Sequence, residues 1–202
     1  MSEEDSEDLR NAAVRRVVAL VAFLNLAYFG VEFSVALNIK SVSLFADSID
    51  FLEDASVNLL ILLALTWSAR NRARLGMALA FILLLPALGT IWALVGKFTS
   101  PSVPEPFTLS VTGGGALIVN LSCALMLARI RHHAGSITRA AFLSARNDAI
   151  ANVAIIAAGL VTALTGSIWP DAAVGIGIGI MNIDAAREIW EAAHEEHHNA
   201  AA

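Results

Sequence analysis

The sequence predicts an all-α, polytopic membrane protein with six transmembrane helices and both termini in the cytoplasm. Three observations lead to this fold class. Hydrophobic residues make up 57% of the 202 residues and charged residues only 15%, whereas soluble domains are about 45–50% apolar. The apolar residues also form long uninterrupted runs, and basic residues gather on one side of the membrane that these runs would cross.

The apolar runs are each long enough to cross a hydrocarbon core about 30 Å thick. Charged, Pro-bearing or Gly-bearing breaks separate them. The six runs lie near 15–37, 42–68, 74–96, 109–130, 140–164 and 171–193. We therefore predict an acidic cytoplasmic tail over 1–14, one six-helix transmembrane domain over 15–193, and a short cytoplasmic tail bearing His and Glu over 194–202.

The distribution of Arg and Lys sets the predicted orientation, because short cytoplasmic loops carry an excess of both. Lys40 and Lys97 fall on the side expected to face outward. The basic residues near the opposite ends of the runs are Arg10, Arg15, Arg16, Arg70, Arg72, Arg74, Arg129, Arg131 and Arg139. Both termini of this multi-pass protein are therefore expected in the cytoplasm, and we place it in a bacterial inner membrane.

Acidic side chains interrupt the second run. An ionisable residue at the centre of a spanning helix costs about 2.5–3.5 kcal/mol on insertion scales, so such residues usually face an ion path or a bundle interior. At about 100° per residue, Asp47, Asp50, Asp54 and Asn58 fall within one stripe, whereas Glu53 lies to one side. This stripe predicts a functional site.

The fifth run carries a second polar set, formed by Ser144, Asn147, Asp148 and Asn152. This run enters the membrane from the opposite face, and Asp50 and Asp148 both lie about ten residues, or roughly 15 Å, from where their helices begin. The two stripes are therefore expected to meet near the middle of the bilayer. Their shared spacing, two ligand-type residues and an Asn at intervals of four, is compatible with an internal repeat of the kind seen in transporters.

Carboxylates this close cannot all stay ionised without a cation. The empty site should therefore take up protons, which a divalent metal would displace on binding. With Cys123 as the single cysteine, no thiolate cluster can form, so oxygen and nitrogen atoms must hold the metal. Two alternatives stay open: the acids could pair with Arg146 or backbone groups and only hold helices together, and Asn58 and Asn152 could bridge helices by hydrogen bonds.

The two stripes resemble those of the cation diffusion facilitator family of metal transporters. That family's second helix typically reads Ala-Asp-x-x-[His/Asp]-x-x-x-Asp and its fifth [His/Asp]-x-x-x-Asp. The resemblance covers about residues 15–193 and places the transported-metal ligands at Asp50, Asp54, Ser144 and Asp148. Other similar positions are Asn25 and Glu32 in the first run, the segment 43–47 (Ser-Leu-Phe-Ala-Asp) and the segment 169–171 (Trp-Pro-Asp).

The resemblance implies a zinc efflux transporter that exchanges metal for protons by alternating access, without a cofactor or an enzymatic activity. Ser144 stands where the family has His or Asp, so Asn147 or water is expected to complete the shell, and Asp47 is a secondary candidate. An all-oxygen shell favours harder ions such as manganese or iron. Cadmium and cobalt are further candidate substrates.

The expected partners are divalent metal ions, protons and the lipid bilayer, and no nucleic acid. Most members of the family continue into a cytoplasmic domain that supports dimerisation, and we do not expect that domain in this chain. A homodimer is therefore expected to form through the transmembrane domain.

The histidines fall on the predicted cytoplasmic side. His194, His197 and His198 share one helical face at i, i+3 and i+4, a spacing that suits an imidazole-rich metal site. A solvated polar tail is the alternative interpretation. The neighbouring His132 and His133 would need a loop to bring them to a metal.

Two other functions remain to be considered. Phosphatidyltransferases also place paired aspartates on helices, but the Asp-Gly-x-x-Ala-Arg half of their motif is missing from this sequence. A metal-permeable channel is the third option, and a proton-gradient dependence of the flux would distinguish a carrier from it.

Overall fold

The computed structural model describes residues 3–64, 88–130, 135–181, 187 and 191. Within these residues the chain forms helices and no strand, which confirms the predicted all-α class. The helical segments are α1 (Glu3–Ile39), α2 (Val42–Ala64), residues 88–99, α4 (Pro106–Ile130), α5 (Gly135–Thr165) and Trp169–Met181. Residues 65–87 and 182–186, which belong to the predicted second, third and sixth runs, lie outside the described part.

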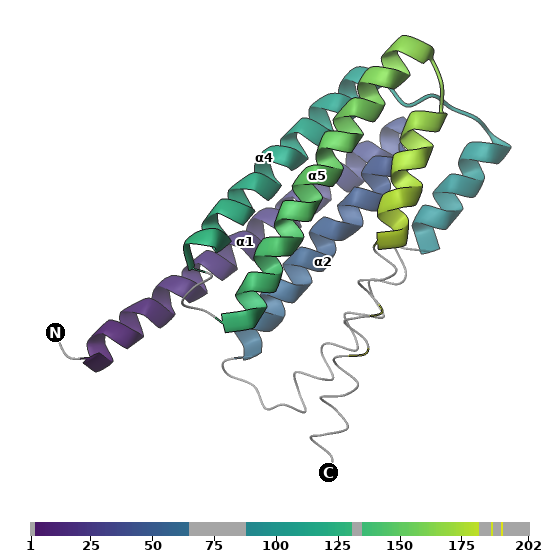
Figure 1. The fold of residues 1–202 in the computed structure, drawn as a ribbon. Helices are drawn as coiled ribbons and strands as arrows, with labels where there is room; N and C mark the ends of the chain where they lie inside the picture. The colour runs from purple at the N-terminus through teal and green to yellow at the C-terminus, as the bar shows by residue number, and fades with distance from the viewer. Residues whose placement is uncertain (1–2, 65–87, 131–134, 182–186, 188–190, 192–202) are drawn as a thin grey trace.

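Four long helices, α1, α2, α4 and α5, lie side by side as a bundle (Figure 1). The segments 88–99 and Trp169–Met181 lie together against the α2 side of this bundle. Phe98 and Trp169 join these two segments through rings whose centroids are 5.7 Å apart. The bundle therefore supplies the two helices that carry the predicted stripes, and the short pair of helices flanks one of them.

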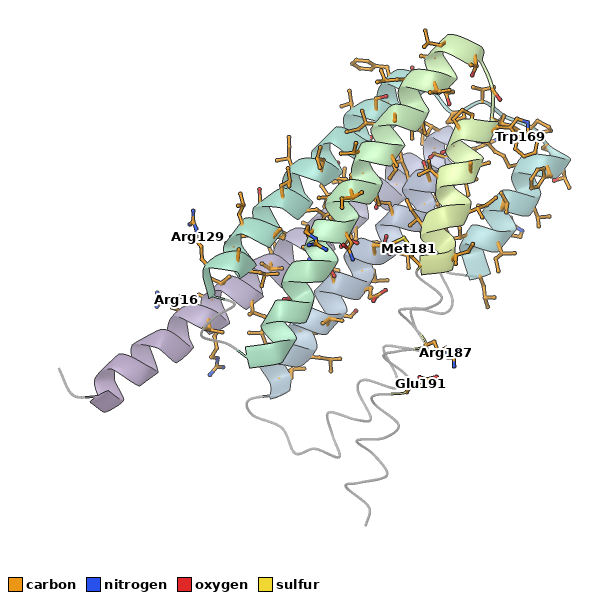
Figure 2. All side chains as sticks on the ribbon, viewed as in Figure 1. Arg16, Arg129, Trp169, Met181, Arg187 and Glu191 are labelled. Atoms are coloured by element: carbon orange, nitrogen blue, oxygen red, sulfur yellow. The ribbon has the colours of Figure 1, made fainter. Side chains whose placement is uncertain are left out.

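Three of the described helices are long and apolar enough to cross a membrane: Ala12–Ile39, Pro106–Arg129 and Ala145–Thr165. Helix α2 has 23 residues, but its four acidic side chains distinguish it from these three. Large apolar side chains cover the outer faces of the bundle, as Phe107 (75% exposed) and Leu164 (87% exposed) illustrate. Figure 2 shows Arg16 and Arg129 at one end of the bundle and Trp169 at the other.

The joint between α1 and α2 is short and fully hydrogen-bonded. Helix α1 ends at Ile39, and Lys40 adopts a left-handed conformation with φ of 55°. The Ser41 N–H then donates to the Ala36 carbonyl at 3.0 Å, which is the bond that closes a Schellman-type helix end. The end of α1 therefore falls between the predicted runs 15–37 and 42–68, two residues later than the first run was expected to end.

Small residues let the helices approach closely, as is common between helices in membranes. At Gly175 an added Cβ would lie 2.8 Å from the Ser43 amide nitrogen, so Trp169–Met181 touches the first turn of α2 backbone to backbone. At Gly113 on α4 it would lie 2.9 Å from Ile155 Cγ2 on α5. These approaches fix α2 and α5 within the bundle.

Candidate metal centre

The stripe on α2 faces the bundle interior. Asp47 is fully buried and Asp54 is 8% exposed, while Asp50 and Glu53 are partly exposed. The last member of the stripe, Asn58, is buried and donates its Nδ2 to the Asp54 carbonyl of the same helix at 2.7 Å. Asn58 therefore bridges no helices through this bond.

The structure brings Asp148 of α5 to the acids of α2. Asp148 is 8% exposed, and its carboxyl group lies near enough to those of Asp54 and Asp50 for their charges to interact. Carboxyl groups from two antiparallel helices thus meet inside the bundle, where a cation or protons must offset their mutual repulsion.

The carboxyl groups do not yet form a closed cage. Within the described residues, no three His, Cys, Asp or Glu side chains converge closely enough to hold a metal ion. Asp54 and Asp148 are the two buried members of the set, and Asp50 is partly exposed. The arrangement therefore brings carboxyl groups of two helices near one another without enclosing an ion.

The remaining predicted residues fall into two groups. Asn147 is exposed and accepts a hydrogen bond from Arg146 Nη2 at 3.4 Å, so the structure does not bring it to the buried pair. Ser144 lies on α5 one turn before Asp148, and its side chain lies outside the described part. The histidines also lie outside the described residues: His132, His133, His194, His197 and His198.

Asn152 links the two stripes directly. Its Nδ2 donates to Asp47 Oδ2 at 2.5 Å, and its Oδ1 accepts from Asn120 Nδ2 of α4 at 2.9 Å. Asn152 therefore bridges helices, one of the two roles considered for it. Asn120 was not singled out from the sequence, although a lone amide within the apolar run 109–130 is the signal that could have found it.

A further buried acid lies on α1. Glu32 is fully buried beside Asp47, and neither of its oxygens has a hydrogen-bond partner within the described residues. Asp47 Oδ1 and Asn25 Nδ2 are likewise without a partner there. Because unpaired polar atoms are costly to bury, protons, water or a cation are needed to satisfy these atoms.

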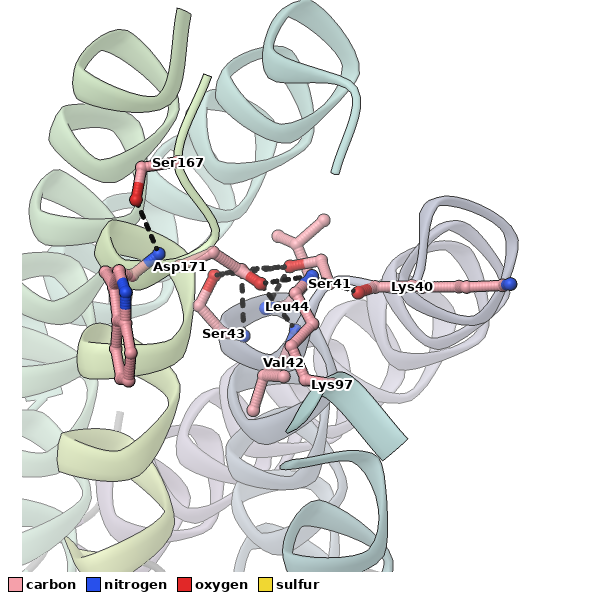
Figure 3. A network of polar contacts seen from close by, with 9 residues as sticks. Lys40, Ser41, Val42, Ser43, Leu44, Lys97, Ser167 and Asp171 are labelled. Atoms are coloured by element: carbon pink, nitrogen blue, oxygen red, sulfur yellow. Dashed lines mark hydrogen bonds and ion pairs between the residues drawn. The ribbon is translucent and has the colours of Figure 1, made fainter. Parts of the chain in front are cut away.

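The end of the bundle opposite Arg16 and Arg129, which the sequence analysis expects to face outward, is tied together by Asp171, the acid of the Trp-Pro-Asp segment (Figure 3). Its Oδ1 accepts from the side chains of Ser41 at 2.6 Å and Ser43 at 2.7 Å, and its Oδ2 accepts from the Val42 N–H at 3.0 Å. Ser41 Oγ in turn accepts from the Leu44 N–H at 3.1 Å. Ser41 and Asp171 together cap the first turn of α2, whose N–H groups have no partner within the helix.

Lys97, from the segment 88–99, completes this outer network. Its Nζ lies 3.2 Å from Asp171 Oδ2 and donates to the Lys40 carbonyl at 2.7 Å. Both Lys97 and Asp171 are buried, so the ion pair is shielded from water. The network joins α1, α2 and both short helices at the end of the bundle that lies opposite Arg16 and Arg129.

A comparison with protein families agrees with this geometry. Residues 18–195 match the cation efflux transmembrane domain, a range that includes both acidic stripes and the outer network. A comparison with curated proteins gives no significant match. Members of the cation efflux family are membrane-embedded transporters of divalent metal ions rather than enzymes. This chain therefore belongs to the cation efflux, or cation diffusion facilitator, family of metal transporters.

Proposed function

We propose that this protein exports a divalent metal ion from the cytoplasm in exchange for protons, and that Asp50, Asp54 and Asp148 bind the ion. One observation carries the proposal: two buried carboxyl groups from different helices, Asp54 on α2 and Asp148 on α5, lie near enough inside the bundle for their charges to interact. Two buried carboxylates repel each other unless a proton or a cation offsets their charges. The same pair can therefore hold either of the two exchanged species.

The exchange follows from competition between the metal ion and protons for the same carboxylates. Metal ligands must be deprotonated, so a divalent ion that binds the carboxylates releases their protons. Protons that reach the site from the outside then displace the ion. Because the metal and the protons cannot occupy the site together, each passage of the ion in one direction is matched by protons moving in the other.

The closed outer end supports an alternating-access mechanism. Asp171 and Lys97 hold the first turn of α2 against the neighbouring helices, and the bond between Asn152 and Asp47 ties α5 to α2 one turn outward from Asp50 and Asp148. We infer that these contacts keep the candidate ligands apart from the outer side in this conformation. Release of the ion to the outside requires α2 and α5 to part at the level of Asp47.

Zinc is the substrate that we propose first, because the family resemblance favours it. The candidate ligands Asp50, Asp54 and Asp148 offer only oxygen, however, and carboxylate ligands suit manganese and iron better than imidazole does. Manganese or iron is accordingly the alternative substrate. Cadmium and cobalt are further candidates.

The family resemblance and the charge distribution also underlie our proposals for the cellular context. The concentration of Arg at one end of the bundle supports cytoplasmic termini, with 1–14 and 194–202 as tails of the domain 15–193. His194, His197 and His198 are proposed to form a cytoplasmic metal site. We further propose a homodimer formed through the transmembrane domain, in a bacterial inner membrane.

Everted membrane vesicles that carry the full chain test the function. With a proton gradient imposed, the wild type is expected to accumulate Zn²⁺ with saturable kinetics, and a protonophore should abolish the uptake. Asp54→Asn and Asp148→Asn keep the size of the side chain but remove its charge, so uptake should fall to the level of vesicles without the protein.

Glu191→Gln is the matched control, because Glu191 is an exposed acid whose only described pair is the surface contact with Arg187. This variant should transport normally. Normal uptake in both the Asp54→Asn and the Asp148→Asn variants would contradict the proposed site. A flux that does not saturate and ignores the proton gradient would indicate a channel instead of a carrier.

A further inference from the structure

A chain of buried amides crosses three helices next to the candidate ligands. Asn120 of α4 is 2% exposed, and Asn152 of α5 and Asp47 of α2 are fully buried. Asn120 Nδ2 donates to Asn152 Oδ1 at 2.9 Å, and Asn152 Nδ2 donates to Asp47 Oδ2 at 2.5 Å. Each amide donates a hydrogen bond to the next residue, so the chain of donors leads from Asn120 on α4 to the carboxylate of Asp47 on α2.

The first bond of this chain decides the orientation of the second amide. A side-chain amide has one acceptor oxygen and one donor nitrogen. Because Asn120 supplies a donor, the oxygen of Asn152 turns toward α4 and its nitrogen turns toward Asp47. The reversed orientation would place two nitrogens together on one side and two oxygens together on the other, and both contacts are repulsive. Asn120 thus helps to fix the orientation in which the amide nitrogen of Asn152 faces Asp47.

The chain lies one helical turn from the candidate ligands on both helices. Asp47 precedes Asp50 by three residues, and Asn152 follows Asp148 by four. Residues with these spacings share a helical face. A bond between Asp47 and Asn152 therefore fixes the rotation and the axial register of α2 relative to α5, which decide how Asp50 and Asp54 face Asp148.

We propose that Asn120 is a positioning residue for metal binding, which acts through Asn152 to hold the ligands of α2 and α5 in register. The inference rests on the proposed function. Asn58 provides a contrast within the same bundle, because its amide bonds to the backbone of its own helix. The amide of Asn120, by comparison, bonds to another helix, α5, and is connected to α2 through Asn152.

The proposal predicts a change in metal affinity without loss of the transport cycle. Removal of a residue that orients metal ligands typically lowers metal affinity about 10–100-fold. In Asn120→Leu the carboxylates remain but are no longer held in register, so the KM for Zn²⁺ should rise about tenfold or more. The kcat should change far less than the KM, because no exchanging carboxylate is lost.

A double-mutant comparison tests whether Asn120 acts through Asn152. Asn152→Leu should raise the KM at least as much as Asn120→Leu, and the double variant should be no worse than Asn152→Leu alone. Ser122→Ala is the matched control on α4, because Ser122 is only partly buried and donates to the Ile118 carbonyl of its own helix. Asn120→Ala provides a second variant without added volume if Asn120→Leu folds poorly.

The measurements are Zn²⁺ uptake in everted vesicles and calorimetric titration of Zn²⁺ into the purified full chain. If the Asn120 variants keep the wild-type KM and Kd for Zn²⁺, the positioning role is wrong. It is also wrong if the increases in KM of the two single variants multiply in the double variant. A wild type that binds Zn²⁺ but does not exchange it for protons would contradict the proposed function alone, and the Kd values of the variants would still decide the role of Asn120.

Discussion

Lys97 Nζ lies 3.2 Å from Asp171 Oδ2, and the two side chains are 2% and 0% exposed. The pair brings together residues that are 74 positions apart in the sequence (171 − 97). Its carboxylate also caps α2, and its ammonium group also binds the Lys40 carbonyl. A single buried ion pair thus holds the outer ends of four helical segments.

Asp171→Asn should destabilise the protein markedly. Removing one partner of a buried ion pair typically costs about 3–5 kcal/mol, because the other charge stays buried without compensation. An amide nitrogen would also face donors at a position where both oxygens of Asp171 accept hydrogen bonds. Thermal unfolding in detergent should show a clearly lowered midpoint.

The double variant Asp171→Asn/Lys97→Met is the control for this prediction. It removes the stranded ammonium group, so it should recover part of the lost stability. If it proves less stable than Asp171→Asn, Lys97 would contribute mainly through the Lys40 carbonyl rather than through the ion pair.

Ser144→His should increase the affinity for Zn²⁺. The family resemblance places Ser144 at a ligand position, one turn before Asp148, and imidazole is a much better zinc ligand than a hydroxyl group. We expect the Kd for Zn²⁺ to fall about tenfold or more and the Kd for Mn²⁺ to change less. Calorimetric titration of both ions into the wild type and the variant measures the difference.

Arg146→His is the neighbouring control for this substitution, since Arg146 is exposed and the variant adds the same ring about 200° away around the helix. An equal gain in both variants would indicate an adventitious imidazole site. No gain in Ser144→His would show that position 144 lies outside the metal shell.

Helix α4 should lose its N-terminal cap in acid. Glu105 accepts hydrogen bonds from the Phe107 N–H at 3.0 Å and the Thr108 N–H at 2.6 Å. Hydrogen bonds from Thr108 and Phe107 lower the pKa of Glu105 below its usual 4.5. Because the folded state holds the ionised form more tightly, the cap contributes its stability above about pH 4.5. That stability is lost as the pH falls through the lowered pKa.

Hydrogen-exchange protection factors for the first turn of α4 measure this effect. Protection should be high at neutral pH and should decrease below the usual pKa of a glutamate. Glu105→Ala should show the low protection at every pH. Equal protection in the wild type and in Glu105→Ala at neutral pH would contradict the capping role.

The features that follow from helical periodicity could be predicted from the sequence. The stripe of Asp47, Asp50 and Asp54 and the position of Asp148 follow from 3.6 residues per turn, and the break near Lys40 follows from local composition. The all-α class and the separation of α1 from α2 were therefore accessible without a structure. The metal-ligand assignments remain predictions.

The contacts between helices were not accessible in the same way. Lys97 looked like a loop residue on the outer side, but it is buried because Asp171 and the Lys40 carbonyl surround its ammonium group. Asn120 was one polar residue in an apolar run, and its bond to Asn152 depends on how α4 rotates against α5. Such partners are set by tertiary packing, which periodicity alone does not encode.

The α1–α2 joint also has a mechanical consequence. Four consecutive N–H groups, from Ser41 to Leu44, all donate to fixed acceptors, so the corner cannot bend without breaking several hydrogen bonds at once. We expect α1 and α2 to move as one stiff lever, together with the outer ends of the short helices. In the proposed transport cycle, opening toward the outside would then be a rigid rotation of α1 and α2 against α4 and α5, and the bond between Asp47 and Asn152 is the contact that it would break.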